Sequence, residues 1–366
     1  MPLYMDVHIV PGVKARDVAA AHELDLVHQH EHGCTAMTYW VDESRGNVFC
    51  LIEAPDAKAV EEMHRQAHGL IPNKVIEVNS SVVDSFLGRI YDPESAERGN
   101  DGLKVFEDVS YRVLLITEGT DRVLLQHQLG SDRADELFQH LNNIIRMSLA
   151  QHQGREAEHR SEGFIISFTS AKQAVACAFG IQSALAAAQL QIPGFKMAIH
   201  AGEPVEKTDL LFGDTIQLAS HLCKIANDHQ LAISSAVQEL LAKEALPKRS
   251  NQVCMLSPQD ERILEQLYTS LEANWQEPDF DIEEYCQDVT MSKSQLYRKT
   301  ISLTGLSPNA LLMQFRLDKA KELMKQQRYS ISQITFDAGF SSPSYFTKCF
   351  KKKYGLLPMA YLELLQ

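Results

Sequence analysis

Histidines are concentrated at the start of this chain. Seven of its 14 histidines lie within the first 68 residues, at positions 8, 22, 28, 30, 32, 64 and 68. His64 and His68 are four residues apart in a helical pattern, so their imidazoles point to the same side. Asp6 and His8 share one face of an expected strand. Because converging imidazoles bind first-row divalent metals, the pattern predicts a metal site.

The predicted ligands are side chains with nitrogen, oxygen or sulfur donors: His8, His22, Asp25, Cys50, His64 and His68. Asp25 is either a ligand or a group that orients one. The alternative is that the histidines lie on the outer faces of amphipathic helices and that Cys50 is packed in a core. The run from His28 to His32 is expected to be a solvated helix end. Nickel, copper and zinc all suit such a site, so the divalent transition metal stays open.

Short β-type runs and helical patterns alternate around these residues. The expected strands are Tyr4–Val10, Ala36–Val41, Val48–Glu53 and Val75–Val78, and the expected helices are Ala15–His30 and Ala57–His68. The order βαββαβ is that of a ferredoxin-like domain, which we place at residues 1–90. Helices cover one face of such a sheet and leave the other free to pair with a second copy. We therefore expect a homodimer.

The same segment, about Pro2–Val78, resembles the DUF4242 family, which is described as nickel-binding. The resemblance rests on five motifs: DVH at Asp6–His8, AHELD at Ala21–Asp25, YWVDE at Tyr39–Glu43, FCLIEAP at Phe49–Pro55 and HRQAHG at His64–Gly69. It implies a small domain that binds metal through these histidines.

Positive charge is concentrated near the other end of the chain. Between Ser292 and Lys353 there are twelve Lys or Arg and three Asp or Glu, although the whole chain has a net charge of −13. A local excess of basic residues attracts the phosphates of nucleic acid. The acidic total therefore does not exclude DNA as a partner.

Two stretches in this region repeat at a spacing of 49 residues: DIEEYCQDVTMSKSQLYRKTI from Asp281 and SISQITFDAGFSSPSYFTKCF from Ser330. Each indicates a helix, a tight turn and a second helix. The second helices are expected to pack inward through Leu296, Ile301, Tyr345 and Phe350. The helix expected between the units, Pro308–Gln326, is about 28 Å long, compared with about 34–36 Å for one DNA turn. Two recognition helices could thus enter successive major grooves.

The polar faces of the two second helices supply the candidate DNA contacts. The first unit contributes Lys293, Ser294, Gln295, Arg298 and Lys299, and the second contributes Ser342, Ser344, Thr347, Lys348, Lys351 and Lys352. Lys and Arg pair with phosphates, while Arg, Gln and hydroxyl groups also read base edges.

About Pro258–Gln366 resembles the DNA-binding domain of the AraC family, with the run Gly339–Pro358 similar to its signature. The sequence departs from that signature at Leu357, where Thr or Ser is usual, and at Leu362, where Arg is common. Both positions belong to the terminal helix. The resemblance implies an all-α domain at 258–366 with two helix-turn-helix units, double-stranded DNA as its partner, and RNA polymerase as a further one.

The middle of the chain, about Tyr111–Leu246, resembles class III adenylate and guanylate cyclases. The resemblance rests on the stretches beginning HRSEGFIISF and MAIHAGEPVE. A working cyclase holds two divalent cations with two carboxylates and steadies the reacting phosphorus with polar groups. Here Thr117 or Glu118 stands near the expected Asp, and Gln217 and His221 replace the usual Asn and Arg. The pattern implies a non-catalytic dimerisation or ligand-sensing α/β domain at 105–248.

Taken together, the 366 residues indicate a multidomain α+β protein with linkers at Tyr91–Gly102 and Leu246–Pro258. Its start lacks a signal-peptide pattern and its most apolar stretch is interrupted by polar residues, so we expect a cytoplasmic protein without a membrane partner. We predict a DNA-binding transcription regulator that responds to a metal or small ligand. One alternative is a cyclase with residual activity through Glu118 and Glu162. Another is a metal-buffering protein that also binds DNA.

Overall fold

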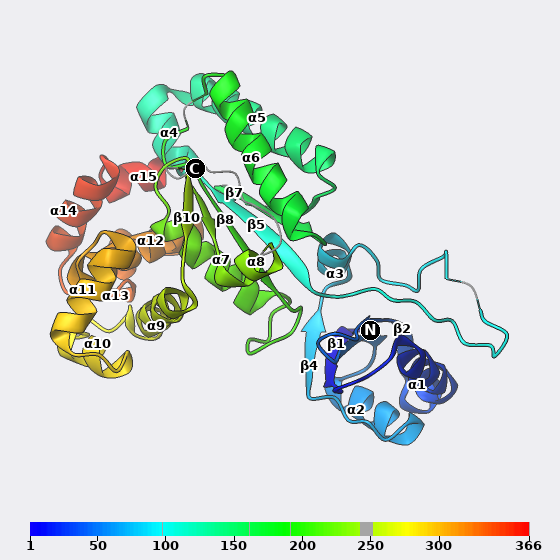
Figure 1. The fold of residues 1–366 in the computed structure, drawn as a ribbon. Coiled ribbons are helices and arrows are strands. Elements are labelled where there is room, and N and C mark those ends of the chain that lie inside the picture. The colour runs from blue at the N-terminus through cyan, green and yellow to red at the C-terminus, as the bar shows by residue number, and fades with distance from the viewer. Residues whose placement is uncertain (97, 161, 191, 242–251, 366) are drawn as a thin grey trace.

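The chain folds into three packed domains. The computed structural model describes residues 1–96, 98–160, 162–190, 192–241 and 252–365. Figure 1 shows the N-terminal domain in blue and the helical domain in yellow to red on different sides of the central domain. The predicted multidomain α+β architecture is confirmed.

The N-terminal domain has the predicted βαββαβ order and an antiparallel sheet ordered β2-β3-β1-β4. Its strands are β1 (Leu3–Ile9), β2 (Thr35–Asp42), β3 (Asn47–Glu53) and β4 (Lys74–Val78). Its helical segments are α1 (Ala15–His28), η1 (Gln29–His32), α2 (Ala57–Ala67) and α3 (Ser80–Leu87). Side chains alternate along β1, so Asp6 and His8 lie on the face covered by α1 and α2. Met5 and Val7 lie on the opposite face.

That opposite face is not free, and the prediction that it is open to a second copy is wrong. Met5, Trp40 and Leu51 are fully buried there, against α3 and a loop of the central domain. Phe86 of α3 stacks on Phe212 of that loop at 5.0 Å between ring centroids. The apolar residues that follow β4 form α3, which contacts β6 and β7 of the central domain and belongs to the same buried cluster as this face of the sheet. A homodimer stays a prediction and would have to use another surface.

The central domain is built on a six-stranded sheet ordered β10-β9-β8-β5-β7-β6. Its strands are β5 (Arg112–Glu118), β6 (Arg155–Arg160), β7 (Gly163–Phe168), β8 (Lys196–Gly202), β9 (Leu231–Ile233) and β10 (Val253–Met255). Its helices are α4 (Arg122–Leu129), α5 (Ser131–Gln151), α6 (Ala171–Ala187), α7 (Gly213–Ile225) and α8 (Ser235–Leu240). Helices α5 and α6 cover one face of the sheet, and α7 covers the other.

The predicted linker Leu246–Pro258 is wrong in its second half. Val253, Cys254 and Met255 form β10, which pairs in parallel with β9 and is the edge strand of the sheet. Positions 246–251 lie outside the described residues. A run of three residues suffices for a short edge strand, because β9 supplies the hydrogen-bond partners.

The helical domain contains α9 (Pro258–Asn274), α10 (Ile282–Asp288), α11 (Lys293–Thr304), α12 (Pro308–Lys325), α13 (Ile331–Asp337), α14 (Pro343–Tyr354) and α15 (Pro358–Leu364). Helices α10 and α11 form the first helix-turn-helix unit, and α13 and α14 form the second. Two predicted core positions are wrong, since Ile301 is 49% exposed and Tyr345 is 51% exposed. The other two predicted core positions, Leu296 and Phe350, are fully buried, and Thr300 and Phe346 take the inward places of Ile301 and Tyr345.

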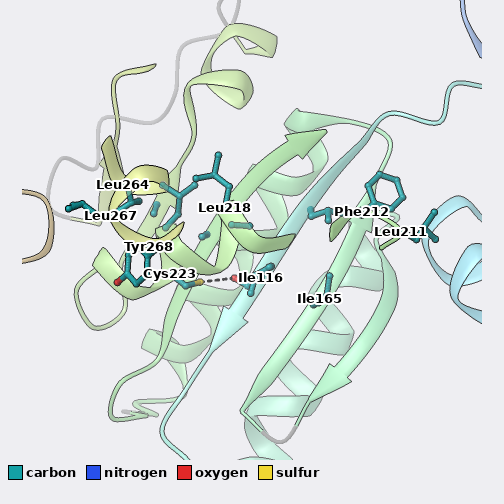
Figure 2. Close-up of a cluster of buried hydrophobic side chains, with 14 of the residues drawn as sticks. Ile116, Ile165, Leu211, Phe212, Leu218, Cys223, Leu264, Leu267 and Tyr268 are labelled. Atoms are coloured by element: carbon teal, nitrogen blue, oxygen red, sulfur yellow. Dashed lines mark hydrogen bonds between the residues drawn. The ribbon is translucent and has the colours of Figure 1, made fainter. Parts of the chain in front are cut away.

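An apolar interface joins the helical and central domains. Figure 2 shows Leu218 and Cys223 of α7 facing Leu264, Leu267 and Tyr268 of α9, and all five side chains are buried. This core is continuous with the covered face of the N-terminal sheet. Among the residues that the structure describes, no helix has the length and apolarity needed to cross a bilayer.

Candidate functional site

Donor side chains meet beneath the N-terminal helices. Asp6 and His8 of β1, Cys50 of β3 and His64 of α2 are all buried, and their donor atoms lie within 4.8 Å of one another. Asp6 stands directly opposite Cys50 in the antiparallel register of β1 and β3. Two strands and one helix therefore bring a carboxylate, a thiol and two imidazoles to one point.

A second group of donors shares His64 with the first. Asp25 of α1, His64 and His68 also have donor atoms within 4.8 Å of one another. His64 Nε2 lies 2.8 Å from Asp6 Oδ2, while His64 Nδ1 lies 3.1 Å from Asp25 Oδ1 and 3.0 Å from His68 Nε2. We call Asp6, His8, Asp25, Cys50, His64 and His68 the donor cluster. His64 is its centre.

Burial and neighbouring charges shift the pKa values of the donor cluster. Burial alone would raise the pKa of Asp6, but the charge and hydrogen bonds of His64 and His8 outweigh it and hold that pKa below its usual range. Burial lowers the pKa of His64, yet Asp6 and Asp25 more than offset this and raise it to about 10. Burial, with nearby Asp6 and Asp25, raises the pKa of the Cys50 thiol well above its ordinary value.

The donor chemistry fits a first-row divalent metal. Imidazole, thiolate and carboxylate groups are the ligands that nickel, copper and zinc take in proteins. A cavity of about 220 Å³ lies beside the cluster and is lined by His8, Asp25, Cys50 and His68, among others. The donors therefore lie close to one another and also border a cavity that an incoming ion could enter.

One predicted ligand lies apart from the donor cluster, and one member was not in the predicted set. His22 lines the same cavity, but its Nε2 is 4.0 Å from Asp92 Oδ1 and its ring packs on Tyr39. His28 and His32 bond to Glu31 and Gln66 on the surface. Asp6 was recognised only as a neighbour of His8 on β1. Its register opposite Cys50, which a single sequence does not display, brings it within 2.8 Å of His64 Nε2.

The recognition helix of the first unit, α11, presents a polar outer face. Lys293, Ser294, Gln295 and Arg298 are exposed. Lys299 is half-buried, and its Nζ lies 3.4 Å from Asp260 Oδ1 of α9. The face that could meet DNA is therefore formed by the first two turns of α11.

The cap of α11 occupies part of this face. Ser292 and Gln295 form a capping box, in which the Ser292 backbone N–H donates to Gln295 Oε1 at 3.0 Å. The Gln295 oxygen is thus engaged, and its amide NH₂ is the part left to read a base. The sequence predicted Gln295 as a DNA contact but did not show that its side-chain oxygen caps the helix.

The recognition helix of the second unit, α14, repeats the arrangement. Its exposed residues include Ser344, Tyr345, Lys348, Lys351 and Lys352. The Ser342 hydroxyl accepts from the Tyr345 backbone N–H at 3.5 Å as the helix cap, and Thr347 is half-buried. Tyr345 was expected in the core, but its position on the outer face makes it a further candidate DNA contact.

Two family models match this chain. A model described as nickel responsive protein SCO4226-like matches residues 4–78, and a model described as a helix-turn-helix domain matches residues 285–363. The first range contains the whole donor cluster. The second contains both recognition helices.

Known proteins resemble separate parts of the chain. The HTH-type transcriptional regulator GbdR of Pseudomonas aeruginosa is 28% identical over 152 residues, which cover 40% of this chain and 41% of GbdR. The crystal structure of SCO4226 from Streptomyces coelicolor A3(2) is 31% identical and covers 21% of this chain and 94% of that one, with a TM-score of 0.20. The guanylyl cyclase Cya2 is 17% identical and covers 36% of this chain and 77% of that one, with a TM-score of 0.30.

The chain spans between 8% and 49% of the length of the first curated relatives that it matches. The likeness therefore concerns domains and not whole proteins. This chain has an SCO4226-like domain at its N-terminus and an AraC-type helix-turn-helix domain at its C-terminus.

Proposed function

We propose that this chain is a DNA-binding transcription regulator of AraC type that works in the cytoplasm and responds to a divalent transition metal. Its three parts are a metal sensor at residues 1–90, a non-catalytic central domain at 105–248 and a DNA reader at 258–366. The observation that carries the proposal is the pair of exposed, basic recognition helices in one domain, joined by α12.

The two helices divide the work of DNA recognition. Lysines on the outer faces, such as Lys348 and Lys351, neutralise phosphates and give most of the affinity. Arg298 and the amide of Gln295 stand at the exposed start of α11, where recognition helices reach base edges. Binding should therefore weaken steeply with salt, while sequence preference follows from the residues on the first turns.

The donor cluster is the proposed sensor. The ion would be held by Asp6, His8, Cys50 and His64, or by Asp25, His64 and His68. It supplies a divalent positive charge among buried carboxylates. The nickel-responsive description of the matching family favours nickel among the candidate metals. His22 lines the neighbouring cavity and is proposed as an outlying ligand or an entry residue.

The central domain is proposed to lack cyclase activity. Glu162, which a residual cyclase would need as a metal carboxylate, forms an ion pair with Lys325 of the helical domain. Gln217 donates to Glu272 of α9 at 2.7 Å, and His221 Nε2 lies 3.7 Å from the same carboxylate. These three side chains are therefore engaged with the helical domain. Formation of cyclic nucleotide from ATP or GTP by the purified chain would contradict this part of the proposal.

Two partners follow from the proposed role. Double-stranded DNA is the first, and RNA polymerase, which a transcription regulator must influence, is the second. A homodimer would double the number of recognition helices on one operator. A metal-buffering protein that happens to bind DNA remains the competing function, and it differs in predicting that metal occupancy leaves DNA affinity unchanged.

Selection of genomic DNA fragments by the full chain tests the DNA-reading role. The proposal predicts enrichment of a common sequence, and binding to that sequence with an affinity that falls as salt rises. Enrichment of no sequence above background, in a chain that is folded by circular dichroism, would contradict it.

A further inference from the structure

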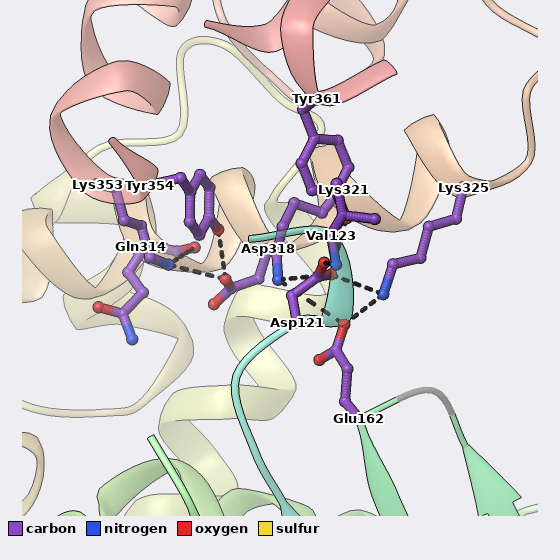
Figure 3. Close-up of polar contacts among 10 residues, drawn as sticks. All are labelled: Asp121, Val123, Glu162, Gln314, Asp318, Lys321, Lys325, Lys353, Tyr354 and Tyr361. Atoms are coloured by element: carbon purple, nitrogen blue, oxygen red, sulfur yellow. Dashed lines mark hydrogen bonds and ion pairs between the residues drawn. The ribbon is translucent and has the colours of Figure 1, made fainter. Parts of the chain in front are cut away.

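A buried carboxylate of the central domain joins two helices of the helical domain. Figure 3 shows Asp121 facing Lys321, Lys325 and Tyr361. The Tyr361 hydroxyl donates to Asp121 Oδ2 at 2.7 Å, and the same oxygen lies 3.0 Å from Lys325 Nζ and 3.5 Å from Lys321 Nζ. Glu162 adds a second carboxylate, which pairs with Lys325 and lies 3.9 Å from Lys321 Nζ.

The position of Asp121 makes this contact specific. Its Oδ1 accepts from the Val123 backbone N–H at 3.0 Å and caps α4, which fixes the carboxylate. Its side chain is only 1% exposed. Burial alone would raise the pKa of Asp121, but the hydrogen bond with Glu162, the two ammonium groups and the Tyr361 hydroxyl outweigh it and keep that pKa low. Burial and the hydrogen bond with Asp121 raise the pKa of Glu162 instead, and its lysine partners only partly offset this. A charged group this deeply buried is stabilised only while its cationic partners stay in place.

A second contact holds α9 on the other side of the interface. The His221 ring of α7 stacks on Tyr268 with 4.3 Å between centroids, next to the Gln217 and His221 contacts with Glu272. Thus α9, α12 and α15 are all anchored to the central domain. The recognition helices are not covered by these contacts, since Arg298 and Lys348 stay exposed.

The charge of the docked partner opposes DNA binding. The residues before Pro258, which we call the body, carry 34 Asp or Glu and 22 Lys or Arg. DNA is a polyanion, and repulsion between exposed charges acts over about 8–10 Å at physiological salt. While the helical domain is docked, the acidic body lies beside it and repels DNA. Release of the helical domain would remove this repulsion.

We propose that the ion pairs of Asp121 and Glu162 with Lys321 and Lys325, together with the Tyr361 hydrogen bond, form a latch that holds the helical domain on the acidic body and lowers its affinity for DNA. The inference rests on the proposed DNA-reading function. Opening the latch frees the two helix-turn-helix units as one domain, because α12 stays packed between them through Leu311, Leu317 and Met324.

The test uses the full chain with Asp121→Asn and Glu162→Gln combined. Hydrogen exchange at α4 and α15 reports whether the domains separate, without any DNA. The DNA affinity is measured in parallel at low and high salt. The matched control combines Glu156→Gln and Glu158→Gln, which removes two carboxylates of β6, one half-buried and one exposed, that pair within the central domain.

The latch predicts faster exchange of α4 and α15 in the Asp121/Glu162 variant, and roughly threefold or more tighter DNA binding at low salt than in the control. The gain should shrink as salt screens the body. Unchanged exchange, or faster exchange without a gain over the control, would overturn the latch. Failure of the unmodified chain to select any DNA sequence is a different result, and it would overturn the DNA-reading function itself.

A milder variant keeps the test possible if the combined Asp121 and Glu162 variant misfolds. Tyr361→Phe removes one hydroxyl and keeps the ring, which packs 5.8 Å from the centroid of Phe350. It should speed exchange at α15 and give a smaller gain in DNA affinity. If both variants keep native exchange across the interface, these contacts do not hold the domains together.

Discussion

His64 is the residue on which the proposed sensor depends. It belongs to both donor groups and contacts Asp6, Asp25 and His68. In the proposed metal-bound protein, the imidazole is a ligand of the ion. In the metal-free protein, it forms ion pairs with two carboxylates. The same side chain therefore stabilises the domain and binds the ion.

Replacement of His64 by Gln should weaken nickel binding by about 100-fold or more, because loss of a ligand exceeds the roughly 10–100-fold effect of losing a neighbouring group. Isothermal titration calorimetry of the folded variant measures this change. His30→Gln is the control, since His30 is exposed and lies outside the donor cluster. Equal nickel affinity in the His64 variant and the control would remove His64 from the site.

Arg298 is the strongest candidate for base reading in α11. Arg298→Ala should weaken operator binding by about 1–3 kcal/mol and relax sequence preference at one position, as expected for loss of a base contact. Arg262→Ala removes the same charge from the exposed face of α9, away from both recognition helices. If the two variants lose affinity to the same small extent, Arg298 contributes charge only and does not read a base.

His200 predicts a pH dependence of the central domain. Burial lowers the pKa of His200 to about 4, and its Nδ1 has no hydrogen-bond partner among the described residues. The unfolded chain, with a pKa near 6.5, then binds the proton more strongly than the folded one. The free energy of unfolding should have its full value above pH 6.5 and fall by up to about 3 kcal/mol as the pH drops towards 4.

Urea unfolding at pH 7 and pH 4.5 measures this loss. In a His200→Gln variant the difference between the two pH values should be smaller by about that amount. His140→Gln, at an exposed position of α5, serves as the comparison and should keep the full difference. A His200 variant with the same pH dependence as the unmodified chain would show that other groups cause it.

At the scale of elements, the second helix-turn-helix unit depends on the glycine at its turn. Gly339 has φ +73° between α13 and α14, and an added Cβ would lie 2.2 Å from the Trp275 carbonyl oxygen. Gly339→Ala should therefore cost more than the roughly 1 kcal/mol of left-handed strain alone and destabilise the helical domain by several kcal/mol. Thermal unfolding gives the size of the effect.

Gly355 provides the comparison for this prediction. It has φ +83° after α14, but an added Cβ would meet no atom within 4 Å. Gly355→Ala should cost only about 1–2 kcal/mol, the strain of the backbone alone. Similar losses at both positions would mean that the close approach at Gly339 is relieved by small shifts.

Elements with a clear period could be predicted from the sequence. Alternation in the N-terminal strands and the 49-residue repeat indicated the ferredoxin-like order and both helix-turn-helix units. One core position in each recognition helix, Leu296 and Phe350, was predicted correctly. The other was wrong by one residue, because Ile301 and Tyr345 are apolar or aromatic but lie about 100° around the helix from the buried Thr300 and Phe346. Short elements such as α3 and β10 carry too few residues to show a period.

The donor cluster was likewise predicted only in part. The His64–His68 spacing lies within one helix, so sequence alone indicated it. The pairing of Asp6 with Cys50 depends on the register of two strands, and the distance of His22 from the cluster depends on how α1 packs. Contacts between elements are decided by packing, which composition and spacing do not record.

At the scale of the whole molecule, one apolar core runs from the covered face of the N-terminal sheet, through α7, to α9 of the helical domain. The contacts that dock the helical domain join residues far apart in the chain, as Tyr361 and Asp121 are separated by 240 positions. No local pattern predicts such a contact. The docked arrangement therefore connects the domain that holds the donor cluster, through packed side chains, to the domain that holds the DNA-reading helices.

The most direct test of a metal-responsive DNA regulator is the affinity of the full chain for its selected DNA at fixed salt, first stripped of metal and then saturated with nickel. We predict that nickel changes the dissociation constant severalfold or more, which corresponds to roughly 1 kcal/mol or more of coupling between the two sites. An identical dissociation constant in both states, with nickel binding confirmed by calorimetry in the same sample, would contradict the account.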